Sequence, residues 1–159
     1  MQAVSNTSPL LNLAIIEQLD LLASQFDTVW IPPAVLEELR IDEALPGVNA
    51  IQKSLQSGWL KTREVRNKQL VQLLERELDR GEAAAIALAA EIKPDYLLLD
   101  ERDARRIAKA MQFSVTGVLG VLIKARQRGK VDDVERLLNA LEKDAGFYIT
   151  QQLRAQILR

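Results

Sequence analysis

Acidic side chains are the main candidates for a functional site in this sequence. The chain contains no cysteine and no histidine, which excludes thiol nucleophiles, imidazole acid–base catalysis and most zinc sites. A metal ion bound here would therefore need oxygen ligands, which suit Mg²⁺, Mn²⁺ or Ca²⁺. The main candidates are Glu38, Glu82, Asp100 and Asp103.

Asp100 directly follows Tyr96-Leu97-Leu98-Leu99, an apolar run typical of a buried central strand. Ligands of open parallel sheets bind beyond the carboxyl ends of the strands, so Asp100 is a site candidate as well as a possible helix N-cap. Asp103 lies one helical turn further on and could face the same cavity or pair with Arg106.

Glu38 and Glu82 lie on predicted helices. Glu82 begins an alanine-rich helix predicted over 82–91, where an acid could either complement the helix dipole or bind a metal ion. Glu37 and Glu38 are adjacent and point in different directions, so at most one of them serves a common site. We choose Glu38 because of the apolar residues around the pair.

Two further strands are expected to end in polar residues. Asn6 and Ser8 follow a strand predicted at 2–5, and Thr116 follows one predicted at 113–115. Because the carboxyl ends of parallel strands meet at one edge of a sheet, these side chains are candidates for the same site.

Short apolar runs alternate with longer helical patterns, which predicts an α/β fold, a three-layer α/β/α arrangement with a mostly parallel central sheet. Strands are predicted at 2–5, 28–31, 60–65, 96–99 and 113–115, with an added edge strand at 147–149. Helices are predicted at 8–16, 18–24, 34–40, 48–56, 68–78, 82–91, 102–111, 118–128 and 131–143, followed by a last helix capped by Thr150. Ser8 is expected to cap the first helix, with Pro9 at its first position.

The chain length of 159 residues suits one domain, 1–159, and 48% apolar residues suffice for a core. A net charge of −1 argues against a general nucleic-acid coat protein but allows a nuclease with a local basic surface. The first residues lack a signal-peptide pattern and no apolar run is long enough for a bilayer, so we expect a cytoplasmic protein and no membrane partner. Aromatic residues form only 4% of the chain, which predicts recognition by shape or polar contacts more than by base stacking.

Four segments together resemble the PIN-domain superfamily, and more narrowly a prokaryotic branch that is similar to the VapC-type toxin nucleases. They are residues 6–10 (NTSPL), 31–39 (IPPAVLEEL), 81–89 (GEAAAIALA) and 97–105 (LLLDERDAR). The resemblance covers almost the whole chain. It implies a parallel sheet between helices and a metal-dependent ribonuclease that uses Mg²⁺ or Mn²⁺.

The resemblance also implies roles for individual residues. The acidic positions of the family fall on Asn6, Glu38, Glu82 and Asp100, with Asp103 beside them. Metal binding is thereby expected at Asn6, Glu82, Asp100 and Asp103, and catalysis at Glu38, Glu82 and Asp100. Asn6 is a departure, because PIN nucleases usually have Asp there; Asn keeps an oxygen ligand but removes one negative charge.

Substrate binding is expected from Ser8, which matches a hydroxyl position near the metal, from Thr116, and from the arginines 102, 105 and 106. The arginines could hold RNA phosphates or form a solvated helix face with ion pairs. The resemblance further implies a homodimer and a small antitoxin protein that masks the site.

Two other functions are compatible with parts of the sequence. A PIN-like protein that has lost catalysis could act as a binding or regulatory module, and Asn6 is the evidence for it. A response-regulator-like receiver would need an acidic pair after its first strand and a lysine after its last core strand. Asn6-Thr7 and Thr116-Gly117 stand at those places, which disfavours a receiver.

Overall fold

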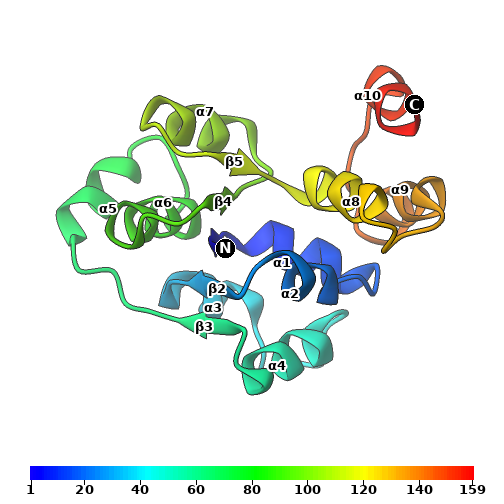
Figure 1. The fold of residues 1–159 in the computed structure, drawn as a ribbon. Coiled ribbons are helices and arrows are strands. Elements are labelled where there is room, and N and C mark those ends of the chain that lie inside the picture. The colour runs from blue at the N-terminus through cyan, green and yellow to red at the C-terminus, as the bar shows by residue number, and fades with distance from the viewer.

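The centre of the protein is a sheet of five parallel strands, seen in a computed structural model that describes all residues 1–159 (Figure 1). The strands are β1 (Gln2–Ser5), β2 (Thr28–Ile31), β3 (Leu60–Thr62), β4 (Tyr96–Leu98) and β5 (Val115–Thr116). Their order is β3-β2-β1-β4-β5, and every neighbouring pair is parallel. The predicted parallel sheet is therefore confirmed.

Ten helices surround this sheet. They are α1 (Thr7–Ile15), α2 (Asp20–Gln25), α3 (Pro33–Leu39), α4 (Val48–Ser57), α5 (Lys68–Leu74), α6 (Arg80–Ile92), α7 (Arg102–Ala110), α8 (Val118–Gln127), α9 (Val134–Asp144) and α10 (Gln151–Leu158). None of them is both long and apolar enough to cross a membrane.

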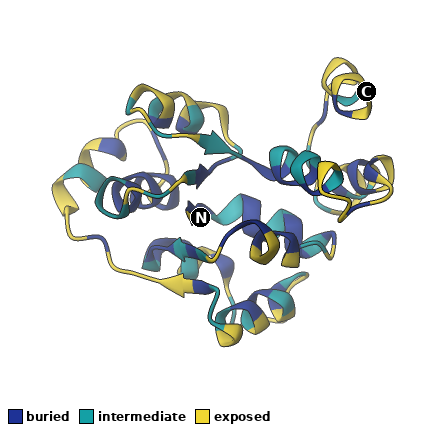
Figure 2. Cartoon of the chain, viewed as in Figure 1, coloured by how far each residue is buried: buried dark blue, intermediate teal, exposed yellow.

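Alternate strand residues face opposite layers of helices, as the pleat of a strand requires. Ala3 and Leu98 pack into a core with α1, α2, α4, α8 and α9, whereas Val4 and Leu97 pack against α5, α6 and α7. Figure 2 shows that the helix faces turned toward the sheet are largely buried, whereas the edge strand β3 is largely exposed. The three-layer α/β/α prediction is confirmed.

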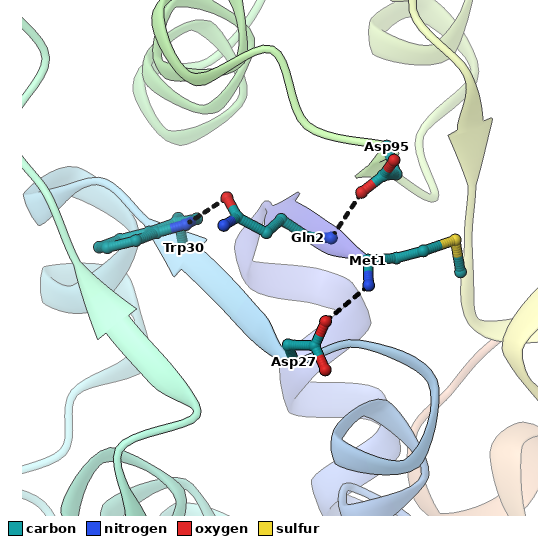
Figure 3. Close-up of polar contacts among 5 residues, drawn as sticks. All are labelled: Met1, Gln2, Asp27, Trp30 and Asp95. Atoms are coloured by element: carbon teal, nitrogen blue, oxygen red, sulfur yellow. Dashed lines mark hydrogen bonds and ion pairs between the residues drawn. The ribbon is translucent and has the colours of Figure 1, made fainter.

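The start of β1 is held by polar contacts on both sides (Figure 3). The ammonium group of Met1 donates to Asp27 Oδ2 at 2.7 Å, and the Gln2 backbone N–H donates to Asp95 Oδ2 at 2.6 Å. Trp30 Nε1 donates to the Gln2 side-chain oxygen at 3.2 Å. These contacts anchor β1 between β2 and β4, and the strand then runs to Asn6 at the opposite edge of the sheet.

Several local predictions differ from the structure. The first helix begins at Thr7 and not after Ser8, because Asn6 is the last residue with extended backbone angles. Pro9 still lies in the first helical turn, where its missing N–H costs nothing. The predicted edge strand at 147–149 does not form: Ile149 is buried in the helical core instead of pairing with β5. Thr150 does cap α10, accepting a hydrogen bond from the Leu153 N–H.

Candidate active site

An acidic cavity of about 660 Å³ opens at the carboxyl ends of β1 and β4. Five carboxylates line it: Glu38, Asp79, Glu82, Asp100 and Glu101. No lysine or arginine is among the lining residues. A concave surface with charges of one sign concentrates counter-ions, so this cavity attracts cations.

Asn6 and Asp100 contribute two buried polar atoms that lack a partner to this cavity. The Asn6 side chain is only 3% exposed, and Asn6 N donates to Leu98 O at 3.1 Å, which holds the end of β1 beside β4. Asn6 Oδ1 and Asp100 Oδ2 are the only buried side-chain oxygens or nitrogens in the protein without a hydrogen bond. Buried polar atoms nearly always have partners, so two orphans in one cavity indicate a missing ligand.

The other carboxylate oxygen of Asp100 is occupied. Asp100 Oδ1 accepts a hydrogen bond from the backbone N–H of Val118, the first residue of α8, at 2.9 Å. Asp100 therefore caps a helix that begins 18 residues later, while Glu101 stands at the N-cap position of α7. Gly117 permits this approach, since a Cβ there would lie 3.0 Å from the Leu99 carbonyl oxygen and still closer to Asp100.

The environment of Asp100 disfavours its charged form. Burial raises the pKa of Asp100 from 3.8 to about 6, although the Val118 N–H and the Arg105 guanidinium both act to lower it. Burial is also the main cause that raises the pKa of Glu82. A bound cation would relieve both effects by compensating the negative charge.

Glu82 forms a capping box with Asp79 at the start of α6. Asp79 Oδ1 accepts from the Glu82 N–H at 2.8 Å, and Glu82 Oε1 accepts from the Asp79 N–H at 3.1 Å. Glu82 is therefore both an acid at the helix N-terminus and a residue that lines the cavity, and Asp79 lines the same cavity. Asp79 was not among the predicted site residues, although an acid three residues before a Glu is the signal of such a box.

Glu38 and its neighbour Glu37 have different partners. Thr7 Oγ1 donates to Glu38 Oε2 at 2.8 Å, which holds Glu38 at the cavity. Glu37 instead forms an exposed ion pair with Arg80 at 3.0 Å. Gly81 leaves room for Glu38, because a Cβ at that position would lie 2.9 Å from its carboxyl carbon.

A family model described as a PIN domain matches residues 2–159. The chain belongs to the PIN-domain family. PIN domains are generally nucleases and usually depend on divalent metal ions. No curated protein and no solved structure matches the chain.

The remaining predicted residues of this PIN domain fall into three groups. Ser8 lines the acidic cavity. Thr116 and Arg105 line a second cavity that adjoins it, and Arg105 Nη1 donates to the Leu99 carbonyl oxygen at 2.7 Å. Arg102, Asp103 and Arg106 are exposed and line neither cavity.

Asn6 and Asp100 fit a hard cation that keeps most of its water ligands. No three Asp or Glu side chains lie close enough together to hold a metal ion as a group. Mg²⁺ is commonly bound through one or two carboxylates and several waters, so a full protein cage is not required. The orphaned oxygens of Asn6 and Asp100 are enough for such a site. Glu38 and Glu82 each use one carboxylate oxygen to accept a hydrogen bond within the protein.

Proposed function

We propose that this PIN domain is a metal-dependent endoribonuclease whose Mg²⁺ or Mn²⁺ is bound by Asn6 and Asp100, with Glu82 beside them. The observation that carries the proposal is the pair of unpartnered buried oxygens, Asn6 Oδ1 and Asp100 Oδ2, in a cavity with five carboxylates and no basic side chain. An RNA phosphate would be repelled from such a cavity unless a cation were present.

In phosphodiester hydrolysis the side chains of the cavity would have different roles. A divalent ion held by Asn6 and Asp100 would supply the Lewis acidity that phosphodiester hydrolysis needs. Glu38 is exposed to solvent and oriented by Thr7, which suits it to accept a proton from the attacking water. Asp100 is oriented by the Val118 N–H, and its second oxygen, Oδ2, stays free of hydrogen bonds within the protein. Glu82 adds negative charge that strengthens cation binding.

We further propose that the enzyme is the toxin of a toxin–antitoxin pair, acting in the cytoplasm as a homodimer that an antitoxin protein masks. The support is the resemblance of its four sequence segments to the VapC-type branch. Leu153 and Leu158, which are exposed on α10, are apolar surface that a protein partner would cover. Light scattering after gel filtration tests the dimer, and rescue of growth by a co-expressed neighbouring gene tests the antitoxin.

A PIN-like binding or regulatory module without catalysis is the second candidate. It is favoured by Asn6 in place of the usual Asp and by the absence of three converging carboxylates. Such a protein would bind no Mn²⁺ through Asp100.

The decisive experiment is Mn²⁺ calorimetry combined with RNA cleavage on the same samples. The wild type is expected to bind Mn²⁺ and to cut RNA, and Asp100→Asn to lose both. Asp103→Asn is the matched control, because Asp103 is exposed and lies outside the cavity; it is expected to resemble the wild type. A wild type that binds no metal and leaves RNA intact would refute the nuclease and favour the binding module.

A further inference from the structure

A second cavity, of about 420 Å³, adjoins the acidic one. Asp100, Phe147 and Tyr148 line both cavities, so they form the boundary between them. Besides these, the second cavity is lined by Arg105, Val115, Thr116, Gly117, Leu119, Gly120 and Leu153. Its size falls in the range of about 300–1,000 Å³ that is usual for small-ligand sites.

Tyr148 lines both cavities and is held there by its neighbours in the chain. It is 83% exposed, the most exposed of the large hydrophobic side chains in the protein. Phe147 packs partly against the helical core and its N–H donates to Leu141 O at 3.0 Å, and Ile149 is 5% exposed. The segment is thus anchored on both sides of Tyr148, while the tyrosine ring itself is left in solvent.

The charges of the two cavities differ in a way that suits a nucleotide. Arg105 is the only basic side chain that lines either cavity, and it belongs to the second one alone. The Thr116 hydroxyl offers a hydrogen-bond donor and acceptor beside it. An aromatic ring and a guanidinium in one cavity provide a stacking surface for a base and a counter-charge for its phosphate.

We propose that the second cavity is a nucleotide subsite, in which Tyr148 stacks on the base next to the cleaved bond and Arg105 holds its flanking phosphate. This inference rests on the proposed ribonuclease function for its orientation, since the shared residue Asp100 places the subsite directly beside the cleavage site. Phe147 and Tyr148, two of the seven aromatic residues of the chain, thereby lie along the proposed RNA path. The low aromatic content alone had predicted little role for base stacking.

The test is fluorescence anisotropy with the full-length protein in Ca²⁺ buffer and two labelled probes. One probe is an octamer of adenylate and the other is an abasic ribose-phosphate chain of the same length. Tyr148→Ala is expected to weaken adenylate binding about five-fold or more and abasic binding less than about two-fold, since stacking acts on the base alone. Tyr148→Phe, which keeps the aromatic ring, is expected to bind oligoadenylate with the affinity of the wild type. Leu73→Ala, which removes an exposed apolar side chain from α5 outside both cavities, is the control and is expected to leave binding unchanged.

The outcomes separate this inference from the proposed function. Equal affinity of Tyr148→Ala and the wild type for oligoadenylate would overturn the subsite, even if the wild type cuts RNA with Mn²⁺. If the wild type cuts no RNA but Tyr148→Ala still binds oligoadenylate more weakly than the wild type, the subsite proposal stands and the nuclease proposal is refuted. Equal losses on both probes would also overturn the stacking role, because they would reflect a contact to the backbone or a general structural defect.

Discussion

Replacing Asp100 by Asn is expected to stabilise the metal-free protein at neutral pH while it abolishes metal binding. Asp100 is charged at pH 7 in a partly buried position, and one of its oxygens has no hydrogen bond. An amide at this position carries no charge to desolvate, and its oxygen can still accept the Val118 N–H bond at 2.9 Å.

The magnitude follows from the raised pKa of Asp100. A rise from 3.8 to about 6 corresponds, at roughly 1.4 kcal/mol per pKa unit, to a cost of about 3 kcal/mol when the group is fully ionised. The folded state binds this proton more tightly than the unfolded state. The stabilisation that the folded protein gains from protonated Asp100 is therefore complete below pH 3.8 and is lost as the pH rises through about 6. Asn lacks this dependence, so the gain over the wild type is about 2–3 kcal/mol at pH 7 and less than about 1 kcal/mol at pH 4.

Urea and thermal denaturation in EDTA, at pH 7 and at pH 4, measure this difference. At pH 7 the gain corresponds to a rise in Tm of roughly 4–12 °C for a chain of this size. Asp103→Asn, an exposed change of the same chemistry, should stay within about 0.5 kcal/mol of the wild type at both pH values. A gain at pH 7 no larger than at pH 4, or a loss of stability at pH 7, would refute the assignment of a desolvated charge to Asp100.

Three further predictions concern neighbouring residues. Asn6→Asp places a negative charge at one of the two orphaned oxygens and should strengthen Mn²⁺ binding in calorimetry; unchanged affinity would place Asn6 outside the metal site. Asp79→Ala removes the capping box of α6 and should cost about 1 kcal/mol in urea denaturation, whereas Asp79→Ser should retain most of the stability. Gly117→Ala places a Cβ 3.0 Å from Leu99 O and should cost about 1–3 kcal/mol by the same measurement; a stability equal to that of wild type would contradict the close approach of Asp100 to α8.

The fold class and most of the elements that carry the site follow from local patterns in the sequence. Alternation of apolar strand runs with helical periods predicts the parallel sheet, because the pleat and the helical turn impose different spacings of buried residues. Local signals also located β2 at Thr28–Ile31 and the cap at Thr150, since both depend on neighbours within a few residues. The strand at 147–149 was wrong because apolar residues bury equally well in a helical core, and a short run does not distinguish the two.

The tertiary structure alone decided which polar groups meet and which remain unpaired. Thr7 and Glu38 are 31 residues apart in the chain, and Asp100 and Val118 are 18 apart, so no local pattern relates them. The same holds for Tyr148, which lies beside Asp100 at both cavities. Sequence patterns report how each element buries its own apolar face, whereas the position of one element against another depends on the packing of the whole core. That packing is what leaves Asn6 Oδ1 and Asp100 Oδ2 without partners in two residues that line the same cavity.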